Sequence, residues 1–259
     1  MGGRMILDQF SLKGKSGIVT GGGTGLGKGM ATAMVQAGGA VLLVGRRMDV
    51  LEKTGKELSK YGAPVIPFPA DVSKMGDIPK IVDRAVKEFG KVDFLINNAG
   101  TIRRAPSEDF SEADWDVVLQ TNLKGPFFLA QAVARTMIAA KRPGTIVNTS
   151  SLIAFIGGKT IPAYAASKGG LNQVTKTMSN DWAKYGIRVN AIAPGYFITD
   201  VTEALQKNKE RYAEIVSRIP MGRWGTPEEL GGIALYLVSD ASSYVTGQTF
   251  VVDGGWMAF

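Results

Sequence analysis

Short apolar runs alternate with longer stretches in which apolar residues recur every three or four positions, along nearly the whole chain. Runs such as Val41-Leu42-Leu43-Val44 would be apolar on both faces of an extended chain, which is typical of strands in a parallel sheet. The longer periodic stretches predict helices with one apolar face. The predicted strands are 17–20, 40–44, 65–69, 92–96, 144–148, 187–192 and 248–252, and the predicted helices are 25–37, 48–61, one ending near 90, two within about 111–140, and 162–185.

This order of elements predicts an α/β fold. Because helical segments connect most successive strands, we expect one doubly wound domain, with a parallel sheet covered by helices on both faces. No Pro/Ser-rich linker, low-complexity tract or internal repeat interrupts residues 1–259, so a single domain is predicted. The polar, helical stretch 198–224 is inserted between the last two strands, and we expect it to be a substrate lid.

The net charge of +7 raises the question of a nucleic-acid partner. Lys and Arg are spread along the chain in short pairs such as Arg46-Arg47, with no basic tail and no recognisable nucleic-acid-binding motif. The charge therefore favours a small anionic substrate or a phosphate-bearing cofactor. No apolar run is long enough to cross a bilayer, and the N-terminal residues, in which Met5 is an alternative start, lack the apolar core of a signal peptide. A cytoplasmic protein with no membrane partner is expected.

The chain contains no histidine and no cysteine, which removes most routes to acid–base chemistry near neutral pH. It excludes a Ser-His-Asp triad, a thiolate nucleophile, a zinc finger and an iron–sulfur cluster. A magnesium or calcium site built from carboxylates alone stays open, but no calcium-binding loop pattern is present and no metal site is predicted.

One conspicuous candidate for proton transfer is left, the pair Tyr164 and Lys168. Residues four apart share one face of a helix, so the ammonium can lie near the phenol. A neighbouring cation lowers the pKa of a phenol, which would make Tyr164 a usable proton donor or acceptor. The alternative interpretation of this short motif is a surface tyrosine with a solvated lysine.

The first predicted strand leads into a glycine-rich turn, Thr20-Gly21-Gly22-Gly23-Thr24-Gly25-Leu26-Gly27. Glycines let the chain turn tightly and let backbone N–H groups approach an anion at a helix N-terminus. The strict G-x-G-x-x-G spacing is absent, and a plain tight connection is the alternative. The position at the first strand–helix junction favours nucleotide binding.

Several motifs together resemble the short-chain dehydrogenase/reductase family. They are Thr20-Gly21-x-x-x-Gly25-x-Gly27, Asn97-Asn98-Ala99-Gly100, Asn122, Ser151, Tyr164-x-x-x-Lys168 and Pro194-Gly195, in the family's order and spacing over essentially the whole chain. The resemblance implies a Rossmann-type fold with a seven-stranded parallel sheet, an NAD(P)-dependent oxidoreductase acting on CH–OH groups, and a homotetramer or dimer.

The resemblance also implies roles for single residues. Tyr164 matches the general acid/base, Lys168 the residue that lowers the tyrosine's pKa and holds the nicotinamide ribose, and Ser151 the hydroxyl that binds the substrate oxygen. Asn122 matches the asparagine that supports a water chain to the lysine. The cofactor-binding residues implied, besides Tyr164 and Lys168, are Gly21, Gly23, Thr24, Gly25, Leu26, Gly27, Asp71, Val72, Asn98, Ala99, Gly100, Pro194, Gly195, Ile198 and Thr199. The C-terminal Asp253-Gly254-Gly255-Trp256 resembles a family signature that is expected to be structural or interfacial.

The end of the second strand bears on the cofactor. An acidic residue there would receive the ribose hydroxyls of NAD, whereas this chain has Val44-Gly45-Arg46-Arg47. Arg46 can offer a permanently charged fork to a 2′-phosphate, or it can stack on adenine or face solvent. NADP(H) is favoured, and NAD(H) stays open.

Within the family, the chain looks most like the branch that acts on sugar acids such as gluconate and 2-dehydro-3-deoxygluconate. Arg103 and Arg104 follow a strand end that borders the expected site, and we predict that one of them pairs with the substrate carboxylate. Solvent-exposed arginines or intersubunit ion pairs are the alternative. Rival functions are a ketoreductase for acyl, steroid or small ketone substrates, and a non-catalytic dinucleotide sensor.

Overall fold

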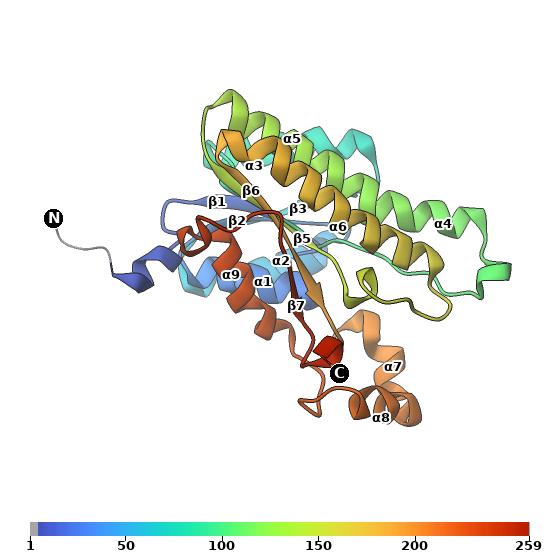
Figure 1. Ribbon diagram of the computed structural model, residues 1–259. Helices are drawn as coiled ribbons and strands as arrows, with labels where there is room; N and C mark the ends of the chain where they lie inside the picture. Colours follow the sequence, from blue (N-terminus) through green and yellow to red (C-terminus); the bar gives the residue numbers. More distant parts are fainter. Residues whose placement is uncertain (1–4, 259) are drawn as a thin grey trace.

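A single seven-stranded sheet forms the centre of the computed structural model, which describes residues 5–258 (Figure 1). The first four residues, part of the N-terminal stretch considered above, and Phe259 lie outside the described residues. Every strand pairing is parallel, and the strand order is β3-β2-β1-β4-β5-β6-β7. The strands are β1 Ser16–Thr20, β2 Ala40–Gly45, β3 Val65–Pro69, β4 Phe94–Asn97, β5 Gly144–Thr149, β6 Ile187–Pro194 and β7 Thr249–Val252. The α/β fold and the seven parallel strands expected from the sequence are confirmed.

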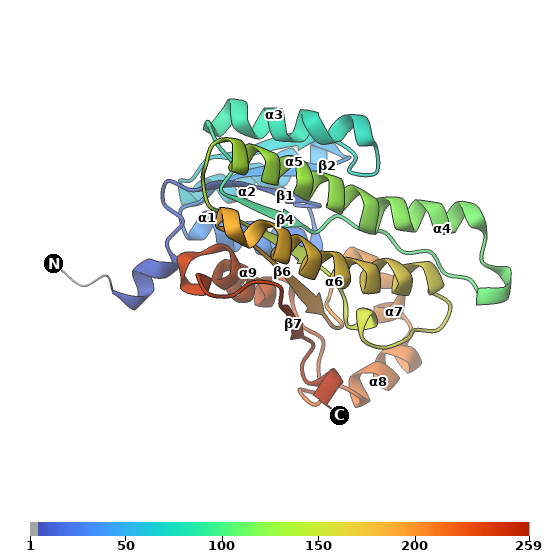
Figure 2. The same ribbon diagram turned by 45° about the horizontal axis from the view of Figure 1, so that its top comes forward.

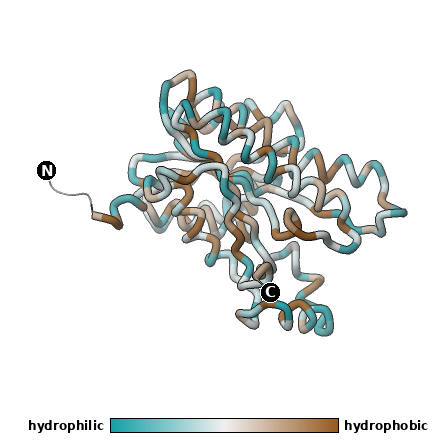
Figure 3. Tube along the Cα trace, viewed as in Figure 1, coloured by the Kyte–Doolittle hydropathy of each residue, from teal (hydrophilic) through white to brown (hydrophobic). Residues whose placement is uncertain are grey.

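Two helical layers cover the sheet (Figures 1 and 2). One layer holds α1 (Gly25–Gln36), α2 (Met48–Leu58) and α9 (Gly231–Val238), and the other holds α3 (Ile78–Phe89), α5 (Gly125–Ala139) and α6 (Pro162–Trp182). A separate apolar core lies between the sheet and each layer. The central strands β1 and β4 are buried at every position, which explains their unbroken apolar runs. Hydropathy alternates along the covering helices (Figure 3), as expected for helices with one buried face.

Two helical features differ from the sequence prediction. The stretch 111–140 consists of α4 (Glu112–Leu119) and α5, joined without a break by a single π-helical segment at Gln120–Lys124. Helix α9 was not predicted, because Gly231-Gly232-Ile233-Ala234-Leu235-Tyr236-Leu237-Val238 is apolar at nearly every position and has no helical period. Its entry is set by a capping box between Thr226 and Glu229.

The stretch 198–224 contains α7 (Glu203–Lys207) and α8 (Lys209–Ser217), which lie next to the C-terminal segment at one end of the sheet (Figures 1 and 2). It packs through a small third core that includes Ile215, Trp224 and Trp256. The ring centroids of Tyr212 and Trp224 are 5.0 Å apart. This end is the carboxyl end of the strands, so the insertion stands beside the edge where ligands bind in such sheets.

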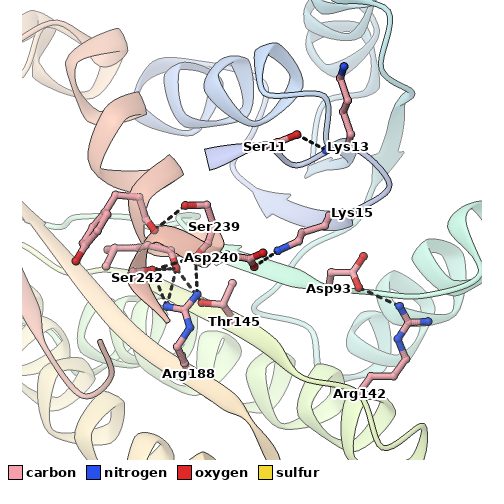
Figure 4. A network of polar contacts seen from close by, with 12 residues as sticks. Ser11, Lys13, Lys15, Asp93, Arg142, Thr145, Arg188, Ser239, Asp240 and Ser242 are labelled. Atoms are coloured by element: carbon pink, nitrogen blue, oxygen red, sulfur yellow. Dashed lines mark hydrogen bonds and ion pairs between the residues drawn. The ribbon is translucent and has the colours of Figure 1, made fainter. Parts of the chain in front are cut away.

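Arg188 on β6 connects the sheet to the C-terminal end of α9 (Figure 4). Its guanidinium donates to the carbonyls of Leu237 at 3.0 Å and Ser239 at 3.0 Å, and to the hydroxyl of Ser242 at 2.8 Å. A cation at this position satisfies the free carbonyls of the last helical turn. Within residues 5–258, no helix is long and apolar enough to cross a membrane. In the same described range, no group of three or more acidic side chains is placed to hold a metal ion.

Candidate active site

A cavity of about 840 Å³ opens at the carboxyl ends of the central strands. The chain places β2 and β3 on one side of β1 and then crosses to the other side, where β4 pairs with β1, so the strand order reverses here and this edge is a topological switch point. Sequence-predicted residues supply much of the cavity wall: Gly21, Thr24, Gly25, Leu26, Asn98, Ala99, Gly100, Arg104, Ser151, Tyr164, Lys168, Pro194, Gly195 and Thr199.

The glycine turn between β1 and α1 owes its shape to missing side chains. Gly21 has φ of +64°, a left-handed conformation that favours glycine. A Cβ at Gly27 would lie 2.1 Å from the carbonyl oxygen of Gly21, so only glycine lets the helix begin this close to the turn. Gly23 instead faces Val50 and Leu51 of α2. The turn therefore brings backbone close to the cavity at the N-terminus of α1, the arrangement that suits a phosphate.

Asn98, just after β4, holds this turn in place. Its amide nitrogen Nδ2 donates to the carbonyl oxygens of Thr20 at 3.1 Å and Gly21 at 3.4 Å. The backbone N–H groups of Asn98 and Ala99 both donate to Thr20 Oγ1, at 2.9 and 3.0 Å. The asparagine motif thus connects the ends of β1 and β4, which border the site, by hydrogen bonds.

Tyr164, Lys168 and Ser151 meet in the same cavity. Tyr164 and Lys168 lie one turn apart on α6, and the Lys168 ammonium is 5.6 Å from the centroid of the Tyr164 ring. Lys168 is buried, and its Nζ donates to the carbonyl oxygen of Thr149 at 2.6 Å. Ser151 follows β5 and caps a short helical turn by accepting the N–H of Ile153 at 3.2 Å. The i, i+4 pairing expected from the sequence is therefore present.

The pKa of Tyr164 differs in direction from the expectation. Burial of the phenol raises its pKa, and a hydrogen bond with Ser151 and the charge of Arg104 only partly oppose this effect. Burial also lowers the pKa of Lys168 to about 8. The four-residue spacing predicted that a nearby cation would lower the pKa of the phenol, but the loss of water around both groups outweighs the charges in this structure.

Asn122 lies behind the cavity wall, fully buried in the π-helical segment between α4 and α5. Its Oδ1 accepts the N–H of Thr101 at 2.7 Å, and its Nδ2 donates to the carbonyl of Thr101 at 2.8 Å and to Ser167 Oγ at 3.2 Å. It thereby connects the irregular segment that follows β4 to α6, the helix that carries Tyr164. A π-helical turn at a functional site is a recurrent feature that sequence periodicity does not reveal.

The two candidate arginines are separated by the structure. Arg104 lines the cavity and is close enough to Tyr164 to influence its pKa. Arg103 does not line it: its Nε lies 3.2 Å from Asp114 Oδ1, and its Nη1 donates to Thr101 Oγ1 at 3.2 Å. Of the residues described, Arg104 forms no hydrogen bond or ion pair with any, so its guanidinium is available to a ligand.

The other predicted cofactor residues lie beyond this cavity. Arg46 is exposed where β2 ends, beside the glycine turn. The carboxylate of Asp71 accepts from Ser73 N–H at 3.0 Å and Ser73 Oγ at 2.7 Å, and Val72 is buried. Ile198 is 45% exposed, between two residues that do line the cavity.

Sequence reasoning missed the segment that closes the other side of the cavity. Residues 152–161 contribute a wall that includes Ile153, Ile156 and Lys159, and Arg211, Arg218 and Trp256 come from α8 and the C-terminus. Thr160 has φ of +62°, and its carbonyl accepts the N–H of Ala105 at 3.1 Å, which ties this segment to the one that carries Arg104. No motif marks residues 152–161, because only the fold brings them to the cavity, whereas α8 belongs to the 198–224 stretch that was expected to be a lid. Trp256 was expected to be structural, yet it also forms part of the wall.

The arrangement suits proton transfer to a polar substrate. Two hydroxyl groups lie beside one buried ammonium, and an unpaired guanidinium shares the cavity with them. Donors fixed in a partly enclosed site can stabilise negative charge that develops on an oxygen atom.

Comparisons with known proteins identify the family and several relatives of this chain. Residues 21–257 match the sequence profile of the family described as Enoyl-(Acyl carrier protein) reductase. The chain is 48% identical over 254 residues to 2-dehydro-3-deoxy-D-gluconate 5-dehydrogenase of Escherichia coli (strain K12), covering 98% of this chain and 100% of that protein. It is 41% identical over 248 residues to gluconate 5-dehydrogenase of Gluconobacter oxydans, covering 96% of each.

A solved structure gives the same result for the fold. The crystal structure of a gluconate 5-dehydrogenase from Burkholderia cenocepacia in complex with NADP and tartrate superposes with a TM-score of 0.93. The two chains are 38% identical, and the match covers 98% of this chain and 100% of that one.

Proposed function

Because the chain belongs to the short-chain dehydrogenase/reductase family, we propose that it transfers a hydride between NADP(H) and a sugar acid such as gluconate or 2-dehydro-3-deoxygluconate. It is an NAD(P)-dependent oxidoreductase acting on CH–OH groups. The observation that carries the proposal is that Ser151, Tyr164 and the unpaired Arg104 line one cavity. The hydroxyl groups of Ser151 and Tyr164 would donate hydrogen bonds to the reacting oxygen of the substrate, and the Arg104 guanidinium would bind its carboxylate.

The chain's own residues fit a dinucleotide phosphate. The turn at Gly21 and Gly27 leaves no room for a Cβ, so the backbone can approach a pyrophosphate at the start of α1. Arg46 stands exposed at the end of β2, where an acidic residue would repel a 2′-phosphate. Relatives solved with bound NADP support NADP(H) as the favoured cofactor, and NAD(H) stays open. When bound, NADP(H) supplies or accepts the hydride at its nicotinamide ring.

Tyr164 would hold the proton that the reaction moves. Since burial raises the pKa of its phenol, the group is protonated at neutral pH and can donate its proton to an oxygen that gains negative charge. Ser151 would donate a second hydrogen bond to the same oxygen. Lys168, with Asn122 behind it, would hold the ribose and keep positive charge near the tyrosine.

The charge in the cavity would select for acids. Arg104 has no protein partner within residues 5–258, whereas its neighbour Arg103 is occupied by Asp114. A substrate carboxylate would accept a charge-assisted hydrogen bond from the Arg104 guanidinium, and a neutral ketose has no carboxylate to do so.

Substitution of the two neighbouring arginines tests this proposal. We expect Arg104→Ala to raise KM for gluconate by about 10- to 100-fold, the value of one charge-assisted hydrogen bond, with less effect on a neutral polyol. Arg103→Ala is the matched control, because it removes the same charge one residue away, and it is expected to change KM by less than about threefold. Steady-state kinetics with both substrates measure the effect. An equal loss with the acid and the neutral polyol would overturn the carboxylate role.

We further propose a cytoplasmic homotetramer in which 198–224 is a mobile lid. The family resemblance supports the assembly, as do Trp115, Val117 and Phe128, which leave apolar surface exposed on α4 and α5. Thr199, Arg211 and Ile215 of the 198–224 stretch line the cavity, which supports the lid.

A further inference from the structure

We propose that Arg218 is a second anion-binding residue of the cavity and that the enzyme therefore binds dicarboxylic sugar acids more tightly than monocarboxylic ones. This inference rests on the proposed function, because it assigns an additional ligand group to the same site. It concerns the side of the cavity formed by α8 and the C-terminal segment, where the sequence predicted no ligand-binding residue.

An aromatic ring fixes the position of Arg218. The carbon at the centre of its guanidinium lies 4.2 Å from the centroid of the Trp256 ring. Trp256 is itself only 8% exposed, and its ring centroid is 5.0 Å from that of Tyr196, which follows β6. A guanidinium stacked on a buried ring loses much of its freedom before any ligand arrives, so little further entropy is lost on binding.

The hydrogen-bond donors of Arg218 are unused. The contact with the Trp256 ring makes no hydrogen bond to an oxygen acceptor, so the N–H groups of the guanidinium stay open to other partners. Over residues 5–258, the Arg218 side chain makes no hydrogen bond and no ion pair. Glu214, one turn earlier on α8, is engaged by Arg211, although the charge of Arg218 helps to lower the pKa of Glu214.

The cavity therefore contains two unpaired guanidinium groups that come from different walls. Arg104 comes after β4, and its charge partly opposes the rise in the pKa of Tyr164 that burial causes. Arg218 comes after α8, and its charge helps to lower the pKa of Glu214. Lys159 also lines the cavity and adds to the positive charge on the side of Glu214. Because the two guanidinium groups come from different walls, a ligand with a carboxylate at each end can offer one acid to each of them, which a monocarboxylic sugar acid cannot.

A matched pair of ligands distinguishes the role of Arg218 from that of Arg104. D-Gluconate and D-glucarate share the same carbon chain, and glucarate has a second carboxylate in place of the terminal hydroxymethyl group. Binding to the enzyme with saturating NADP⁺ is measured by intrinsic tryptophan fluorescence, since Trp256 lies against Arg218. We expect Arg218→Met, which keeps an apolar side chain on the ring, to raise the dissociation constant of glucarate by about 10- to 100-fold and that of gluconate by less than about threefold. Arg218→Lys keeps the charge without the planar fork and should fall between these values.

Lys209→Met is the control, because Lys209 is exposed at the start of the helix that Arg218 follows, carries the same charge and does not line the cavity. It should leave both dissociation constants unchanged. The inference is overturned if Arg218→Met weakens both ligands equally or neither. If gluconate fails to bind the unaltered enzyme, the proposed sugar-acid function falls and takes the inference with it. If gluconate binds and glucarate is not preferred, only the inference falls.

Discussion

Tyr164 and Lys168 illustrate what a sequence can and cannot say about a single residue. Their four-residue spacing predicted that they share one face of a helix, and they do. The direction of the pKa of Tyr164 did not follow from spacing, because it depends on how completely both side chains leave water. Likewise, nothing in the adjacent Arg103 and Arg104 indicated which one lines the cavity. In the folded protein Asp114 pairs with Arg103, and Arg104 is the one that lines the cavity.

The buried Lys168 makes stability depend on pH in the alkaline range. In the folded state its pKa is about 8, against 10.5 for an ordinary lysine. Below pH 8 both states carry the proton, and the cost of burying the charge is fully present. Between pH 8 and 10.5 the unfolded chain holds a proton that the folded protein has released, so the free energy of unfolding rises with pH.

We therefore expect Lys168→Met to change the pH dependence of stability. The free energy of unfolding of the unaltered protein should gain about 3 kcal/mol relative to the variant as the pH rises through this window. Urea denaturation of both proteins at intervals from pH 7 to 10.5 measures the difference, and other titrating groups cancel because they are common to both. A difference that does not change with pH would show that Lys168 keeps an ordinary pKa in the folded protein.

At the level of elements, the sequence predicted strands better than helix details. Strands buried on both faces leave unbroken apolar runs, and all seven were located within a few residues. The π-helical turn around Asn122 adds one residue per turn without a sequence signal, and the apolar α9 has no periodicity to read. The conformation of both elements depends on the residues they pack against in the folded protein, and a local sequence pattern holds no information about those residues.

Two adjacent glycines at the start of α9 give a direct test of this packing. A Cβ at Gly231 would lie 2.9 Å from the Cβ of Ala33 on α1, whereas a Cβ at Gly232 would meet nothing within 4 Å. We expect Gly231→Ala to destabilise the protein by about 1–3 kcal/mol through overpacking. Gly232→Ala should stabilise it by about 0.5–1 kcal/mol, because alanine is the better helix former. Urea unfolding of the two variants is the measurement, and a shift of both in the same direction would contradict the observed α1–α9 contact.

At the scale of the whole molecule, the fold explains why residues far apart in sequence form one site. The parallel sheet places the carboxyl ends of β1, β4, β5 and β6 at one edge, where the glycine turn, Asn98, Ser151 and Gly195 follow their strands. This assembly was predictable, because topology alone brings strand ends together. The part of the wall built from 152–161 was not, because its position depends on the tertiary packing of the third core.

The central claim is that this cavity reduces the ketone of a sugar acid with NADPH, using Tyr164 as the proton donor. The most direct test is the initial rate of NADPH oxidation with 5-keto-D-gluconate, with a neutral ketose and with a simple ketone, repeated with NADH and with Tyr164→Phe. We predict turnover of the keto acid in preference to the neutral compounds, with NADPH preferred over NADH. In Tyr164→Phe, kcat should fall by about 10²–10⁴-fold while NADPH still binds. NADPH binding without turnover of any keto sugar acid, or a Tyr164→Phe variant as active as the unaltered enzyme, would contradict the claim.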